Sequence, residues 1–161
     1  MSAEAVGRLE SVDATASTLI QLVRASIEGG NGFRSAAAEI GDPNLQRLFE
    51  SYSQQRAEFA AELQEELRRH EQALTVLDQA TSPLQPDLMD LKASETGRDE
   101  GTIISERERG EGAAIKVYEK ALAAPLPAEI RSVVERQFLR IKEAHDQVRS
   151  LERAHNRHNP G

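Results

Sequence analysis

The amino-acid sequence predicts an all-α protein, a single antiparallel four-helix bundle. Apolar residues recur at helical spacing in four separate segments. The signals of strands are missing, since no run alternates apolar and polar residues and no Asn-Gly pair joins two β-branched runs. The length of 161 residues suits one domain, and a composition of 39% hydrophobic and 29% charged residues is typical of a globular chain with a real core.

The first two helices are expected at residues 4–40 and 44–77. The first carries one apolar stripe that begins at Leu9 and ends at Ile40. It stops at Gly41-Asp42-Pro43, because Gly is the usual residue just past a helix end and Pro cannot continue a helix. The second carries a stripe from Leu45 to Leu74.

The last two helices are expected at residues 100–123 and 127–156. The third contains a stripe from Ile103 to Leu122 and ends before Pro125. The fourth contains a stripe from Ile130 to Leu151. All four belong to one domain that covers residues 1–161.

The stretch Gly29-Gly30-Asn31-Gly32 tests the continuity of the first helix, because its residues are typical of a turn. A break into two helices is one interpretation. However, Ile27, Gly30 and Phe33 keep the phase of the apolar stripe, as a continuous helix requires. We therefore expect continuity, with glycines that let a neighbouring helix approach closely.

Short connections at residues 41–43 and 124–127 predict two antiparallel hairpins. Between them lies a long connection, residues 78–99, with a short helix expected near residues 84–94. It is long enough to carry the chain from one end of the bundle to the other. The spacing alone leaves both up-down-down-up and up-down-up-down topologies open.

Composition excludes several classes of function. The net charge of −7 repels phosphates, so we expect no nucleic-acid partner. Cysteine is absent, which excludes disulfides, zinc thiolates and thiol nucleophiles. No apolar run approaches the length of about 20 residues that spans a bilayer, and no signal peptide is visible, so the expected location is cytoplasmic, without a membrane partner. No nucleophile elbow or phosphate loop is present either, and no catalytic residues are predicted.

Polar residues that interrupt the apolar stripes are the candidates for a site. They are Glu28 on the first helix, Gln55, Arg56 and Glu58 on the second, Glu108 and Glu111 on the third, and Gln137, Lys142 and His145 on the fourth. A carboxylate inside a bundle must pair, coordinate a metal or take up a proton. In the up-down-down-up topology, Glu28, Gln55, Glu58, Glu111 and His145 fall at a common depth, and in the other topology they scatter.

Five motifs carry a resemblance to a known family: Glu28-Gly29-x-x-Gly32-Phe33, Gln54-Gln55-Arg56-Ala57-x-Phe59, Asp90-Leu91-Lys92, Glu106-x-Glu108-Arg109-Gly110-Glu111 and Ala144-His145-Asp146. Together they resemble the bacterial ferritin-like four-helix-bundle family of unknown function, from about residue 15 to about residue 152. The resemblance implies an up-down-down-up topology with a long crossover between helices two and three. It also implies a continuous first helix and, by loose analogy, a stress-related role.

Ferritin-like di-metal sites use single Glu residues on two helices and Glu-x-x-His on each of the other two. Carried over to this sequence, Glu28 and Glu111 stand for the single carboxylates. The paired motifs are damaged, because Gln55-x-x-Glu58 lacks the histidine and Lys142-x-x-His145 has a cation where a carboxylate belongs. We therefore expect no cofactor and a polar core network of Gln55, Arg56, Glu111, Gln137, Lys142 and His145. Lys142 and Arg56 are each able to pair with Glu111 or Glu108 in this network.

The predicted function is that of a non-catalytic, self-associating bundle whose charged core network replaces an intact di-metal site. The alternative is a protein that binds iron or manganese in a reduced, non-standard site of Glu28, Glu58, Glu108, Glu111 and His145. The sequence does not identify a small-molecule ligand.

Overall fold

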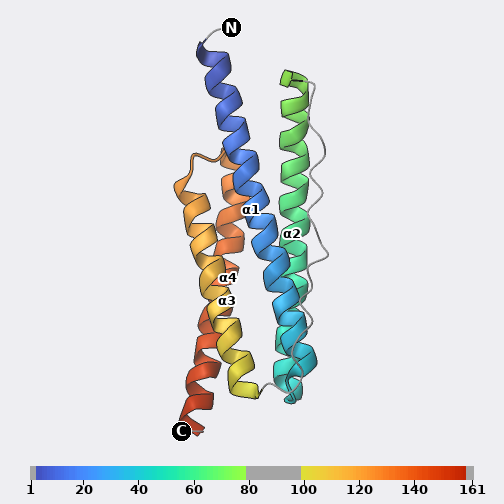
Figure 1. Cartoon of the computed structure of the whole chain (residues 1–161), viewed down its shortest axis with the longest axis vertical. Coiled ribbons are helices and arrows are strands. Elements are labelled where there is room, and N and C mark those ends of the chain that lie inside the picture. The colour runs from blue at the N-terminus through green and yellow to red at the C-terminus, as the bar shows by residue number, and fades with distance from the viewer. Residues whose placement is uncertain (1–2, 79–98, 159–161) are drawn as a thin grey trace.

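The structure is a computed structural model that describes the backbone of residues 3–78 and 99–158 and the side chains of residues 14–71 and 99–157. It contains the helices α1 (Ala3–Glu39), α2 (Pro43–Asp78), α3 (Glu100–Ala123) and α4 (Ala128–His158) (Figure 1). Within these residues the all-α prediction with four helices is confirmed, and each boundary lies within two residues of the expected one. The short helix expected near 84–94 lies outside the described residues.

Helix α1 is continuous through residues 29–32, so the interpretation as two separate helices is wrong. Each Gly inside a helix costs about 1 kcal/mol relative to Ala. Here the missing side chains make room for other helices. A Cβ atom on Gly30 would lie 3.4 Å from the backbone oxygen of Ser53 on α2, and one on Gly32 would overlap the Arg107 guanidinium of α3. The close approach of the α2 backbone explains why glycine is used at position 30, whereas at position 32 the atoms in the way belong to the end of the Arg107 side chain.

Two aspartates begin helices by accepting hydrogen bonds from backbone N–H groups that have no partner within the helix. Asp42 precedes Pro43, and its Oδ1 atom accepts from the N–H groups of Asn44 at 2.8 Å and Leu45 at 3.4 Å. Asp99 accepts from the N–H group of Thr102 at 2.7 Å at the start of α3. The same Gly41-Asp42-Pro43 sequence therefore ends α1 and starts α2.

Arg131 holds the turn between α3 and α4. Its guanidinium group donates to the carbonyl oxygen of Leu122 at 2.9 Å and to that of Ala124 at 2.8 Å. These carbonyls have no helical partner at the end of α3, and a cation is favourable at this negative end of the helix dipole.

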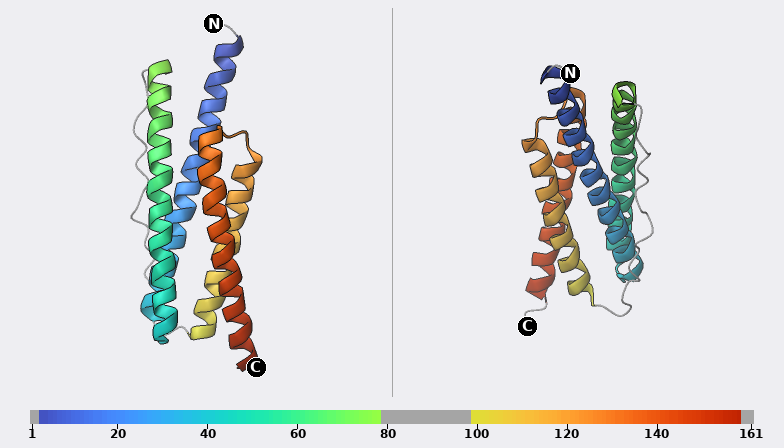
Figure 2. Two further views of the ribbon diagram at one scale, coloured as in Figure 1. Left: turned by 180° about the vertical axis from the view of Figure 1, so that it is seen from behind. Right: turned by 45° about the horizontal axis from the view of Figure 1, so that its top comes forward.

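The helices pack as two antiparallel hairpins, α1 with α2 and α3 with α4 (Figures 1 and 2). Ser26 of α1 contacts Tyr118 of α3, and further along α1 Gly32 faces Arg107, so α1 and α3 are also antiparallel. Helices α2 and α3 consequently run in the same direction. Helix α1 packs on both α2 and α3, whereas α2 approaches α4 only sparsely.

The buried apolar residues form two separate clusters. The Leu19 cluster contains Ala16, Leu19, Leu22, Val23, Phe59, Leu63, Leu67, Ala114, Tyr118, Ala121, Ile130, Val134 and Ile141. The Phe33 cluster contains Phe33, Ala36, Ala37, Ile40, Phe49, Ile103, Ile104 and Val148. No helix in the described part of the chain is both long enough and apolar enough to cross a membrane.

Candidate functional site

A polar layer separates the two apolar clusters. On every helix, the residues between the Leu19 cluster and the Phe33 cluster include glycine or polar residues: residues 29–32 on α1, Arg56 on α2, Glu108 and Glu111 on α3, and His145 on α4. We refer to Arg56, Glu108, Glu111 and His145 as the polar layer. Uncompensated charge inside a protein is costly, so the buried side chains of Arg56 and Glu111 have to balance each other.

The centre of the polar layer is an ion pair between Arg56 and Glu111. The two terminal nitrogens of Arg56 donate to the two carboxylate oxygens of Glu111 at 2.7 and 2.5 Å. The exposed fraction of the side chain is 1% for Arg56 and 0% for Glu111. This bidentate geometry is the strongest form of a carboxylate–guanidinium contact. It also bridges the diagonal of the bundle, between α2 and α3.

Helix α1 forms the niche around this pair. A Cβ atom on Gly29 would lie 3.3 Å from the Nη1 atom of Arg56 and 3.9 Å from the Oε2 atom of Glu111. The carbon at the centre of the Arg56 guanidinium lies 5.5 Å from the centroid of the Phe33 ring, within the range of a cation–π interaction. Glycine leaves space for the guanidinium, and Phe33 provides an aromatic face for it.

Tyr52 lies beside the niche. Its ring centroid is 5.1 Å from that of Phe33. Burial raises the pKa of the Tyr52 hydroxyl, and the nearby negative charge of Glu111 raises it further. The neutral phenol is therefore the favoured form next to the ion pair.

A second pair, Glu108 with His145, lies one helical turn from Glu111 on α3. The Nε2 atom of His145 is 2.9 Å from the Oε1 atom of Glu108. The exposed fractions are 13% for His145 and 25% for Glu108, so this pair is at the margin of the core. It joins α3 to α4, whereas Arg56 and Glu111 join α2 to α3.

A separate chain of hydrogen bonds crosses the Leu19 cluster. The Tyr118 hydroxyl donates to the Oε1 atom of Gln137 at 2.7 Å and lies 3.2 Å from the Ser26 hydroxyl. The Nε2 atom of Gln137 donates to the Glu62 carboxylate at 3.1 Å. Residues from all four helices take part. Burial raises the pKa of the Tyr118 hydroxyl to about 12, so the phenol stays protonated as a donor.

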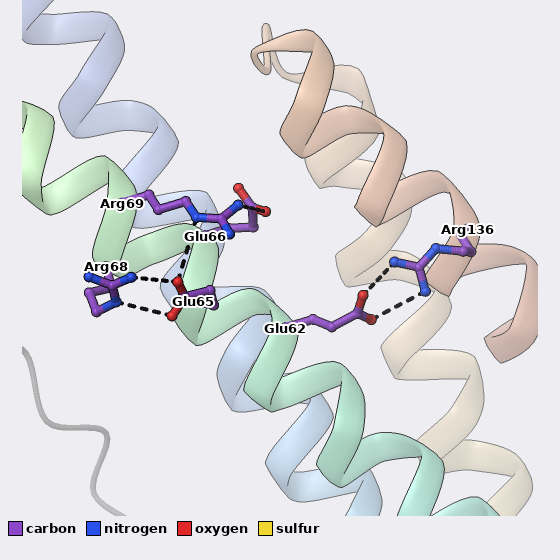
Figure 3. A network of polar contacts seen from close by, with 6 residues as sticks. All are labelled: Glu62, Glu65, Glu66, Arg68, Arg69 and Arg136. Carbon is purple, nitrogen blue, oxygen red and sulfur yellow. Dashed lines mark hydrogen bonds and ion pairs between the residues drawn. The ribbon is translucent and has the colours of Figure 1, made fainter.

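At Glu62 this chain meets a surface ion pair with Arg136 that joins α2 to α4, and separate ion pairs follow along α2 (Figure 3). The carboxylates of Glu62, Glu65 and Glu66 accept from the guanidinium groups of Arg136, Arg68 and Arg69, respectively. Hydrogen bonds from Arg136 lower the pKa of the Glu62 carboxyl, and partial burial opposes this effect. Exposed pairs of this kind contribute little to stability, and the pairs of Glu65 and Glu66 lie on the solvated face of α2.

Three predicted residues lie away from the polar layer. Glu28 and Glu58 are exposed, so neither carboxylate is in the interior. Lys142 is also exposed, and its ammonium group lies 4.7 Å from the centroid of the Phe138 ring. It therefore covers an aromatic side chain instead of pairing with a buried carboxylate.

The other predicted members of the core network are inside. Arg56, Glu111 and Gln137 are buried, and His145 is partly buried. Gln55 is half-buried, with an Oε1 atom that is enclosed but has no hydrogen-bond partner. The structure thus brings Arg56 and Glu111 together, places Gln137 in the neighbouring chain around Tyr118, and brings His145 to Glu108.

The donor set does not fit a di-metal centre. Among residues 14–71 and 99–157, no three His, Asp or Glu side chains converge in a way that could hold a metal ion. The buried carboxylate of Glu111 already has a cationic partner in Arg56, which excludes a second cation from the same oxygens by charge repulsion. Carboxylates from α1 and α2, which the ferritin-like pattern needs, are exposed at Glu28 and Glu58.

Three members of the hydrogen-bond chain, Ser26, Glu62 and Tyr118, are not among the site residues predicted from the sequence. The signal at Ser26 was available, because it follows Leu19, Leu22 and Val23 at helical spacing and so has to be buried. A buried Ser needs a partner, and Tyr118 provides it.

Comparison with known families assigns this chain to one of them. Residues 14–124 match the family described as Domain of unknown function (DUF2383). Because the match covers more than half of the chain, including most of α1 and all of α2 and α3, the chain belongs to that family. No curated protein matches the sequence.

Proposed function

We propose that this member of the DUF2383 family is a non-catalytic, ferritin-like bundle that acts by association, with an interior ion pair in place of a di-metal centre. The observation that carries the proposal is the bidentate pair of Arg56 and Glu111, buried where a metal ligand would have to be free. A neutralised interior stabilises a fold without supplying an open coordination position.

The arrangement of the helices supports the ferritin-like part of the proposal. Helices α2 and α3 run in the same direction, so the end of α2 and the start of α3 lie at opposite ends of the bundle (Figure 1). An up-down-down-up bundle has this property, and ferritin-like folds use one long crossover of this kind. The polar layer, to which α2, α3 and α4 contribute, is also where such folds carry their ligands.

Self-association is the mode of action that we propose. Two features support it: α2 and α4 are the least closely packed neighbours, and Leu139 on α4 is 56% exposed. It is the single large apolar side chain with high exposure in the described part of the chain. We expect light scattering to detect an oligomer and Leu139→Lys to weaken it, and a monomeric wild-type protein would contradict this mode. A sequence without cysteine is compatible with the reducing cytoplasm, which is the location we propose.

Metal analysis tests the proposal directly. We expect protein purified without a histidine tag to contain no stoichiometric iron or manganese, and stoichiometric metal would overturn the non-catalytic reading. The competing reading uses Glu28, Glu58, Glu108, Glu111 and His145 as ligands. It predicts that Glu111→Ala abolishes metal uptake and leaves the helices folded.

Our proposal predicts a different outcome for the same variant. Glu111→Ala leaves the Arg56 guanidinium buried without an anion, which lowers the free energy of unfolding by several kcal/mol whether metal is present or not. Thermal melts of Glu111→Ala with and without added iron or manganese separate the two readings. A normal melt of the metal-free variant would argue against a structural role for the pair.

A further inference from the structure

The niche around the Arg56 guanidinium has the features of a binding site for an organic cation. Its anionic wall is the Glu111 carboxylate, its aromatic wall is Phe33, and its floor is the backbone of α1 at Gly29. We infer that this niche is a site for a planar guanidinium-type cation, and that the guanidinium group of Arg56 occupies this site in the wild-type protein. The inference rests on the proposed function, because it takes the interior to be free of metal.

The first argument is charge. The side chain of Glu111 is 0% exposed, so an ionised carboxylate there requires a cation in contact with it. Hydrogen bonds reach it from Arg56, whose two terminal nitrogens are both committed to it. If the Arg56 side chain is removed, the niche must recruit a proton, a free cation or water.

The second argument is shape. Two parallel N–H···O bonds match a planar fork, which an ammonium group or a spherical ion cannot reproduce. The Phe33 ring lies 5.5 Å from the guanidinium carbon and favours a weakly hydrated, delocalised cation. A divalent metal ion needs several ligands, and a single carboxylate beside an aromatic ring does not provide them.

The third argument concerns which atoms of Arg56 are recognised. Both hydrogen bonds to Glu111 use the terminal nitrogens, whereas the Nε atom is buried and has no hydrogen-bond partner. The niche therefore recognises the terminal nitrogens of the side chain, and not the Nε atom and the aliphatic chain that link them to the backbone. A free methylguanidinium ion can make the same two hydrogen bonds and the same contact with Phe33.

Chemical rescue tests the inference. We expect Arg56→Ala to lower the thermal midpoint, and millimolar methylguanidinium to restore a large part of the loss with saturation, as ligand binding to the folded state requires. Sodium and manganese at the same concentrations should give no comparable rise. The matched controls are wild-type protein, Arg68→Ala at an exposed pair, and Arg56→Ala combined with Glu111→Gln, none of which should respond.

Each outcome decides the question. Rescue by manganese, or equal rescue by sodium, would overturn the assignment to a guanidinium-type cation, and so would the absence of any rescue. If Arg56→Ala does not fold alone, refolding from urea with and without methylguanidinium gives the same comparison, and Arg56→Lys provides a variant that keeps the charge. The metal content of wild-type protein is measured separately, so failure of the rescue is distinguishable from failure of the proposed function.

Discussion

Replacement of Glu111 by Gln is the perturbation that tests the polar layer most directly. The amide is nearly the same size as the carboxylate, so packing is kept while the negative charge is lost. Arg56, 1% exposed, then holds a buried positive charge opposite a group that itself carries N–H donors. Removing one partner of a buried ion pair costs about 3–5 kcal/mol.

The magnitude is large relative to the stability of a domain of this size. Unfolding free energies of single domains are about 5–15 kcal/mol. For a domain of 150–250 residues, each kcal/mol corresponds to about 2–4 °C in the thermal midpoint, so Glu111→Gln should lower it by roughly 6–20 °C. Urea denaturation followed by circular dichroism gives the free energy itself, and urea avoids adding guanidinium ions.

The double variant Arg56→Met with Glu111→Leu separates charge imbalance from lost packing. Replacing both charges by apolar groups of similar volume is often neutral or stabilising, so the double variant should be more stable than either single one. Glu65→Gln on the surface of α2 is the matched control, and its midpoint should not move. A loss below about 1 kcal/mol for Glu111→Gln, as for exposed pairs, would refute the claim that this carboxylate is buried and paired.

Three further predictions follow from the same structure. Near-ultraviolet titration of Tyr52→Phe, which leaves Tyr118 as the single tyrosine, should show tyrosinate forming with a pKa of about 12, and an ordinary value near 10 would contradict its burial. Gly32→Ala should raise the melting midpoint, because alanine is favoured over glycine in a helix by about 1 kcal/mol and the end of the Arg107 side chain can move away from the new Cβ atom. Gly29→Ala should give no such rise, because its Cβ atom would press on the ion pair of Arg56 and Glu111, which is fixed. The pKa of Glu62 is lowered in the folded state, so the stability advantage of wild type over Glu62→Gln should be present at neutral pH and disappear as the pH falls through that pKa. If the thermal midpoints of the two proteins differ as much in acid as at neutral pH, this linkage is excluded.

The helices could be predicted from the sequence because their signals are local. Gly41, Asp42 and Pro43 fix a helix end and a helix start within three residues, and the phase from Ile27 to Phe33 identified α1 as continuous. Such signals depend on backbone chemistry and on one periodic stripe, so no knowledge of neighbouring helices is needed.

The site could be predicted only in part, because pairing depends on which side chains of other helices are in reach. The sequence identifies Glu111 and Arg56 as interruptions of apolar stripes and offers both Glu108 and Glu111 as partners of Arg56, but the choice between them requires the relative positions of α2 and α3. Glu28 and Glu58 show the opposite error: they are close in sequence to the right depth but lie on the outer faces of their helices. A shift of one residue moves a side chain by about 100° around a helix, and counting depth does not detect it.

The remaining question is what the chain gains from an ion pair at a place where apolar residues would serve stability as well. Above and below the polar layer, the buried side chains of α2 and α3 are mostly apolar, and apolar contacts tolerate a shift of one turn. Arg56 reaches Glu111 in one register only, and in any other a buried charge is left without a partner. We therefore expect the double variant Arg56→Met with Glu111→Leu to keep its stability and lose uniqueness, as broader amide resonances and lower hydrogen-exchange protection along α2. If its spectrum is as sharp and as protected as that of wild type, the pair does not select the register, and its role is confined to balancing charge.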